Sequence, residues 1–146
     1  MVPAGAGQMG HDGVSGMDFI KIKETCLYIS DLAAAREFYE GKLGLPVIDY
    51  QPGKHLFLRV GTSVLLCFNP EDSRQKTSPP PHYGGGRQHL ALEVPEIDYD
   101  RAKKDMAKRG IPIIEEVTWK SGARSFYFED PEGNVLEIVP ERGIWD

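Results

Sequence analysis

The order of the predicted elements in this chain runs through once and then begins again, and this internal repeat limits the possible folds more than any single motif does. The run GLPVI at 44–48 corresponds to GIPII at 110–114, and SVLLCF at 63–68 corresponds to NVLEIV at 134–139. A spacing of seven residues also recurs, from Glu24 to Asp31 and from His89 to Glu96. Three matches in the same order indicate two copies of one structural unit.

Each copy is predicted to contain a strand, a helix and three further strands. In the first copy, alternating β-branched and apolar residues predict a strand over 22–29. A helix is expected over 32–43, where apolar residues recur at i, i+3, i+4 and i+7, with Asp31 as its N-cap and Gly44 after its end. The other predicted elements are the strands 47–51, 55–60 and 63–69, then the strand 88–94, the helix 97–109 and the strands 113–118, 125–129 and 134–139.

These elements predict an α+β fold of two βαβββ modules, in which eight strands form a curved mixed sheet with the helices on the outside. Module one covers 20–69, a connecting loop covers 70–86 and module two covers 87–140. Together they form one domain over 18–146, and residues 1–17 are expected to be a flexible leader or a tag.

Composition and charge exclude several classes of function. The 17 Lys and Arg residues are scattered over a chain of net charge −5, so no basic stripe predicts binding to nucleic acid or to a membrane surface. No apolar run approaches the roughly 18 residues of a membrane span, and residues 1–16 lack the regions of a secretory signal. Cys26 and Cys67 are expected to be free thiols, which favours a cytoplasmic location. The expected partner is a small molecule.

Three polar residues are predicted to share one side of the sheet. Alternate strand residues point to opposite faces, so Glu137, between Leu136 and Ile138, faces away from the helices. The same parity places Glu24 and His89 on that side. A carboxylate between apolar neighbours is costly to bury unless it is paired, protonated or bound to an ion. One imidazole and two carboxylates suit one divalent ion such as Zn²⁺, Mn²⁺, Ni²⁺ or Fe²⁺, with positions left open for a substrate.

Three segments resemble a known family: ETCLYISDLAAAREFYEGKLGLPV from Glu24, QHLALEV from Gln88 and GARSFYFEDPEGNVLEIV from Gly122. They are similar to the vicinal oxygen chelate superfamily, which contains glyoxalase I, extradiol dioxygenases, fosfomycin-resistance enzymes and bleomycin-binding proteins. The resemblance covers 18–140. It implies metal ligands at Glu24, His89 and Glu137, and a homodimer.

The same resemblance gives a position for a fourth metal ligand, in the last strand of module one. That position is Leu65 or Leu66, depending on a one-residue offset. Both side chains are apolar, so a four-ligand glyoxalase I site is incomplete here.

The resemblance implies a metal-dependent, glyoxalase-like lyase, isomerase or transferase, whose small substrate chelates the ion through adjacent oxygens. Glu24 and Glu137 are then also the candidate catalytic groups for proton transfer. The alternative from another class is a non-catalytic drug- or small-molecule-binding protein of the bleomycin-resistance type. A ring-cleaving dioxygenase, a fosfomycin-modifying enzyme and a domain that has kept only the fold are further alternatives. Two carboxylates and one His favour a redox-inactive ion over oxygen chemistry.

Three further residues are candidates for substrate binding. Arg124 lies in surroundings where, by the resemblance, fosfomycin-resistance enzymes carry an anion-binding arginine; the alternative is a solvated arginine at a strand end. Tyr127 is expected to donate a hydrogen bond on the side of the sheet that carries Glu137, or else to pack. His82 belongs to the Pro- and Gly-rich stretch 69–86, which predicts a lid, a binding loop or disorder. It is expected to swing over the site, or to be a simple exposed loop histidine.

Overall fold

The fold comes from a computed structural model that describes residues 16–146, so the leader predicted for 1–17 lies outside the described residues except for its last two. The elements of the first half are β1 (Glu24–Tyr28), α1 (Leu32–Arg36), the π-helix η1 (Glu37–Lys42), β2 (Val47–Gln51), β3 (His55–Val60), β4 (Ser63–Phe68) and α2 (Pro70–Ser73). Those of the second half are β5 (His89–Val94), the 3₁₀-helix η2 (Glu96–Asp98), α3 (Tyr99–Lys108), β6 (Glu115–Thr118), β7 (Arg124–Glu129) and β8 (Val135–Pro140).

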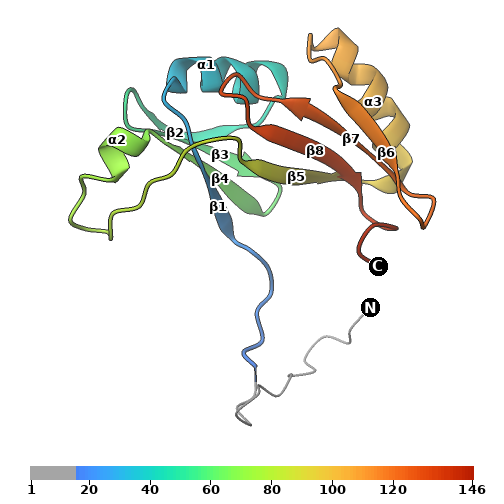
Figure 1. The fold of residues 1–146 in the computed structure, drawn as a ribbon, viewed down its shortest axis with the longest axis horizontal. Helices are drawn as coiled ribbons and strands as arrows, with labels where there is room; N and C mark the ends of the chain where they lie inside the picture. Colours follow the sequence, from blue (N-terminus) through green and yellow to red (C-terminus); the bar gives the residue numbers. More distant parts are fainter. Residues whose placement is uncertain (1–15) are drawn as a thin grey trace.

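The eight strands form two four-stranded sheets with the same topology. Sheet one has the order β1-β4-β3-β2 and sheet two the order β5-β8-β7-β6. In each sheet the first and last strands of the module pair in parallel, and the other pairs are antiparallel. The repeat and the α+β fold of two βαβββ modules are therefore confirmed. The edge strands β1 and β5 approach each other near the middle of the molecule (Figure 1), where Tyr28 at the end of β1 is hydrogen-bonded to Gln88 just before β5.

The helices α1 and α3 lie on the same side of the two sheets, the upper side in Figure 1. Alternate strand residues turn toward this side and are buried, as the parity argument predicts: Leu27 and Ile29 in and after β1, and Leu136 and Ile138 in β8. The core is continuous between the modules, because Phe38 of η1 packs on Phe128 of β7 with ring centroids 6.3 Å apart.

Hydrogen bonds also join the two modules. The Tyr39 hydroxyl donates to Asp130 at 2.6 Å, and Asp130 is only 5% exposed. The same carboxylate accepts from the backbone N–H groups of Glu132 and Asn134 in the β7–β8 turn. At the start of α1, the Ser30 hydroxyl donates to Glu132 at 2.7 Å. Helix α1 is therefore fixed to the turn of the other module.

Several element boundaries differ from the sequence prediction by one or two residues, and three differences have a clear structural cause. The helix expected over 32–43 is present but changes from α to π geometry after Arg36, and the wider turns bury both Phe38 and Tyr39. The strand expected over 63–69 ends at Phe68, because Asn69 caps a short helix: its side chain accepts from the Glu71 N–H at 3.1 Å. This helix, α2, lies in the stretch where no regular structure was predicted, and Pro70 at its first turn is well suited to that position.

Cys26 and Cys67 are both free thiols. Within residues 16–146, no helix is long and apolar enough to cross a membrane.

Candidate functional site

Each sheet has one face packed against the helices and one open face, which we call the cup face. On the cup face of sheet two, strand pairing aligns a row of four residues: Ala91, Glu137, Tyr127 and Glu115. His89 lies on the same face of β5, two residues before Ala91. The cup face of sheet two therefore carries an imidazole, a phenol and carboxylates.

His89 and Glu137 are brought together as the sequence predicted. His89 Nε2 lies 3.3 Å from Glu137 Oε1. Its other ring nitrogen, Nδ1, lies 2.9 Å from the backbone oxygen of Val135. If the Nδ1–H donates to that carbonyl, a neutral ring turns the lone pair of Nε2 toward the carboxylate. Two lone pairs would then face each other, and a cation between them would satisfy both.

Burial makes this pair unusual for a sheet surface. Glu137 is only 7% exposed, although His89 itself is exposed. A carboxylate at this depth is costly unless it is paired, protonated or bound to a metal ion. The donor set of one imidazole and one buried carboxylate fits a divalent ion and leaves its coordination incomplete.

Glu24, the third predicted ligand, is the first residue of β1 and is exposed. Within residues 16–146, no three His, Cys, Asp or Glu side chains lie close enough to hold one ion. Glu24 and His89 do border the same groove of about 750 Å³, which opens between the edges of β1 and β5. The structure of one chain thus pairs His89 with Glu137 and leaves Glu24 apart from them.

Strand pairing decides between Leu65 and Leu66 as the residue of module one that corresponds to Glu137. Leu66 pairs with Cys26 on one side and with Phe57 on the other, as Glu137 pairs with Ala91 and Tyr127. Leu65 faces the core and is 2% exposed. Leu66 is therefore the structural counterpart of Glu137, at the position where the resemblance implies a fourth ligand, and its side chain is apolar.

Tyr127 lies beside the pair, with its ring 6.1 Å from that of His89. Burial, above all, raises the pKa of its phenol, and the neighbouring Glu137 carboxylate raises it further. The hydroxyl consequently stays protonated at neutral pH and is a hydrogen-bond donor on the cup face.

His82 lies on the cup face of module one. Its Nδ1 is 2.8 Å from the Tyr28 hydroxyl, and its ring meets Phe68 edge-on at 4.7 Å. Its backbone oxygen accepts from the buried Ser73 hydroxyl at 2.6 Å, so the short helix α2 holds the loop down. The sequence prediction did not identify the partners of His82. Tyr28 is distant from it in the sequence, and Ser73 belongs to the helix α2, which was not predicted.

Arg124, in contrast, lies on the helix side of sheet two. Its guanidinium pairs with Asp100 at 2.7 Å and with Glu116 at 3.7 Å, and it lies 5.0 Å from the centre of the Tyr99 ring. These partners belong to α3 and β6. Its predicted role in substrate binding stays a prediction, and this placement gives it no support.

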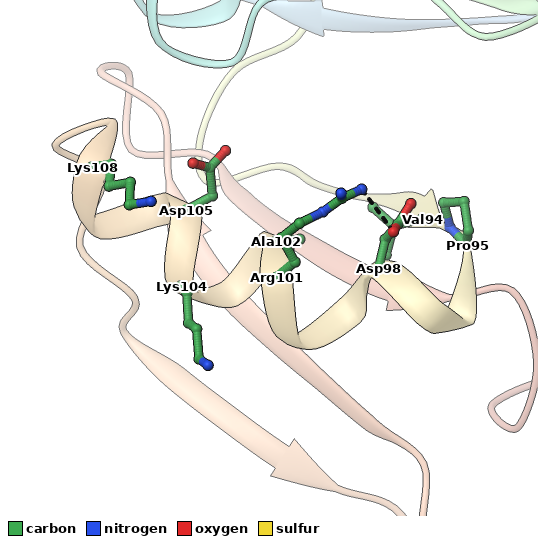
Figure 2. Close-up of a pocket in the computed structure, with 8 residues that line it drawn as sticks. All are labelled: Val94, Pro95, Asp98, Arg101, Ala102, Lys104, Asp105 and Lys108. Carbon is green, nitrogen blue, oxygen red and sulfur yellow. Dashed lines mark hydrogen bonds and ion pairs between the residues drawn. The ribbon is translucent and has the colours of Figure 1, made fainter.

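A second groove, of about 440 Å³, runs along α3 and is separate from the predicted site (Figure 2). Five of its eight lining residues are charged, and Arg101 pairs there with Asp98 at 2.7 Å. It contains none of the predicted ligands. We therefore place the candidate site on the cup faces.

Comparisons with known proteins agree with this fold. The family model described as "Glyoxalase/Bleomycin resistance protein/Dioxygenase superfamily" matches residues 21–138. The chain is 29% identical over 112 residues to a curated protein of Serratia marcescens described as "Glutathione transferase FosA", which covers 77% of this chain and 74% of that protein.

Solved structures show the same similarity. A lactoylglutathione lyase from Agrobacterium tumefaciens superposes with a TM-score of 0.81 at 31% identity, and covers 86% of this chain and 96% of its own. A glyoxalase/bleomycin resistance protein/dioxygenase from Nocardioides superposes with a TM-score of 0.68 at 26% identity, covering 85% of each chain.

Proposed function

Because the chain belongs to the glyoxalase/bleomycin resistance protein/dioxygenase superfamily, we propose that it is a metal-dependent, glyoxalase-like enzyme with one divalent ion bound by Glu24, His89 and Glu137. The substrate is a small molecule that binds through two adjacent oxygens. The reaction is that of a lyase, isomerase or transferase, and the similarity to a lactoylglutathione lyase and to a glutathione transferase supports this class. The free thiols Cys26 and Cys67 fit a reducing compartment, and we propose the cytoplasm.

The observation that carries the proposal is the pair of His89 and Glu137. A buried carboxylate faces an imidazole nitrogen at 3.3 Å, while the other nitrogen of the ring lies against a carbonyl. A metal-binding histidine is typically oriented by such a second hydrogen bond. A sheet built only for stability has no need of this arrangement, which is costly to bury.

We propose that Glu24 reaches the ion from a second copy of the chain. Within residues 16–146 of one copy, Glu24 is not gathered with the other two ligands. Two copies related by a twofold axis would form two equal sites, each with Glu24 of one copy and the histidine–glutamate pair of the other. Apolar surface next to β1 supports a partner there: Phe19, Ile20 and Ile22 are 83%, 96% and 77% exposed.

A divalent ion at this site supplies Lewis acidity toward the two substrate oxygens. The residues of the chain would do the rest. Glu24, the exposed carboxylate, is the candidate base for a substrate proton, since Glu137 is buried against His89. Tyr127 remains protonated and would orient a substrate oxygen as a donor. His82, held by Tyr28, would close the aromatic end of the cup.

The fosfomycin-modifying alternative receives less support. An anionic phosphonate is best bound by an arginine on the cup face, and Arg124 lies on the helix side in ion pairs with Asp100 and Glu116. The cup face of sheet two instead carries the carboxylates Glu115 and Glu137.

The second candidate function, a non-catalytic small-molecule-binding protein, does not require a metal ion. Aromatic rings on the cup face of module one favour it: His55 stacks on Phe57 at 4.0 Å, and Phe68 contacts both rings and His82. Such a surface suits an aromatic ligand. This protein would bind its ligand equally well with and without a divalent ion.

The test is a metal titration of the chelated wild type, Glu137→Ala and the control Glu93→Ala, which removes an exposed carboxylate from the same face of β5 as His89. We expect the wild type and the control to take up one ion per chain and to gain about 2.7 kcal/mol of stability at 100 times the dissociation constant. Glu137→Ala should do neither. If none of the three proteins responds to Mn²⁺, Ni²⁺, Zn²⁺ or Fe²⁺, the proposed function is wrong and the binding protein becomes the better hypothesis.

A further inference from the structure

Gln88 forms an unusual connection between the two modules. Its side-chain oxygen accepts from the Tyr28 N–H at 3.2 Å, and its side-chain nitrogen donates to the Tyr28 carbonyl at 3.3 Å. One amide side chain thus satisfies both backbone groups of a residue on the neighbouring edge strand, as a paired strand would do. Gln88 immediately precedes β5, whereas Tyr28 ends β1.

The other side of Gln88 is fixed to buried structure. Its backbone N–H donates to Asn134 Oδ1 at 3.0 Å, and its side-chain nitrogen lies 3.4 Å from the same oxygen. Asn134 is fully buried, and its own amide donates to Asp130 at 3.0 Å. The Gln88 carbonyl accepts from the Val135 N–H at 2.8 Å. The glutamine is therefore held in one orientation, so that it is a rigid link rather than a loose surface contact.

This link joins the two strands that carry the proposed ligands. Tyr28 lies on the same face of β1 as Glu24, and Gln88 is the residue next to His89. Val135, which bonds the Gln88 carbonyl, also provides the carbonyl for His89 Nδ1. Any movement of Gln88 would change the angle between β1 and β5, and with it the distance between the ligands on these strands.

We infer that Gln88 is a positioning residue of the metal site: it fixes the edge of β1 against the edge of β5 so that Glu24 and His89 are presented at the correct angle. This inference rests on the proposed function. In a dimer whose sites each take Glu24 from one copy and His89 from the other, the link in each chain would connect the two sites.

The test compares Gln88→Met, which keeps the length and removes the polar atoms, with the matched control Gln75→Met in the exposed segment after α2. Amide exchange of Tyr28 in the metal-free protein measures the link itself. Co²⁺ binding and the visible spectrum of bound Co²⁺ measure the ligand geometry. If Gln88→Met does not fold, Gln88→Glu replaces it for the Co²⁺ measurements alone, because it keeps the acceptor for the Tyr28 N–H and loses the donor to the Tyr28 carbonyl.

We expect exchange of the Tyr28 amide to become about tenfold faster in Gln88→Met, the effect of one lost hydrogen bond. We expect Co²⁺ to bind roughly 10 to 100 times more weakly, the usual effect of changing a residue that orients a ligand, with an altered spectrum. A role in stability alone would lower the melting temperature and leave the affinity and the spectrum unchanged, and that result would overturn the inference. Failure of the wild type to bind Co²⁺ would instead refute the proposed function, and the exchange of Tyr28 would still report on the link.

Discussion

Leu66 occupies the position in module one that Glu137 occupies in module two. Each lies on the cup face of the last strand of its module, paired with the first strand on one side and the third on the other. The two modules share a fold, yet only one of them has a carboxylate at this place. The proposed site therefore has three ligands from the protein and one position that is apolar.

This relationship predicts that a carboxylate is tolerated at Leu66 and not next to it. Leu66→Glu should fold and bind Mn²⁺ at least about tenfold more tightly, because a fourth ligand, a carboxylate, is added to an open coordination position. Leu65→Glu places the same group in the core, where an unpaired charge is strongly destabilising. Melting curves and Mn²⁺ titrations of both variants check this. A Leu66→Glu protein that folds and binds no more tightly would contradict it.

The loop that carries His82 should depend on Gly84. A methyl group at Gly84 would lie 2.8 Å from the Tyr28 ring, whereas one at Gly85 meets nothing within 4 Å. Gly84→Ala should therefore push the loop away and break the contact of His82 with the Tyr28 hydroxyl, and Gly85→Ala should not. The His82 imidazole signals in NMR spectra should move in the first variant only. Equal spectra for the two variants would show that the loop is not seated on Tyr28.

The buried link between modules should be a main contributor to stability. Asp130→Ala removes the acceptor of the Tyr39 hydroxyl and of the turn N–H groups, and should cost roughly 2 to 3 kcal/mol. Tyr39→Phe removes one hydroxyl and leaves the carboxylate with its turn donors, so we expect about 1 kcal/mol. Urea denaturation measures both values. A smaller loss in Asp130→Ala than in Tyr39→Phe would contradict this account.

Glu116 predicts a pH dependence of stability. Hydrogen bonds from Lys103 at 2.7 Å, first, and from Tyr99 at 2.8 Å hold the pKa of this carboxyl below its ordinary value of 4.5. A lowered pKa in the folded state means that the group stabilises the fold above pH 4.5 and that this stability is lost as the pH falls through the lowered pKa. Glu116→Gln should therefore melt below the wild type at pH 7, with the difference disappearing under acid conditions. Glu115→Gln, on the exposed neighbour, is the control and should show little difference at either pH.

The sequence predicted the parts of this structure that follow from periodicity. The two modules follow from the internal repeat. The burial of Leu136 and Ile138 and the position of Glu137 on the other face follow from alternation along a strand. The same parity places Arg124 with Phe126, which is buried, on the helix side. The prediction that Arg124 binds substrate came from the resemblance, and parity already argued against it.

Other features could not be read from the sequence, because they depend on contacts between distant segments. The choice between Leu65 and Leu66 required the pairing of β1 with β4. The seating of His82 depends on Ser73 in a helix of four residues, too short to produce a periodic pattern. The bonds between Gln88 and Tyr28 join residues in different modules. Whether Glu24 joins the site from the same chain or from another depends on assembly.

The most direct test of the central claim is therefore a complementation measurement. Glu24→Ala and Glu137→Ala chains, each with its own affinity tag, are co-expressed, and the mixed dimer is purified through both tags. Its Mn²⁺ content is then compared with that of each homodimer. The account predicts no tightly bound ion in either homodimer and one ion per mixed dimer, because one of its two sites combines the intact Glu24 of one chain with the intact His89 and Glu137 of the other. A mixed dimer that binds no ion, beside a wild type that binds one per chain, would contradict a site shared between two copies.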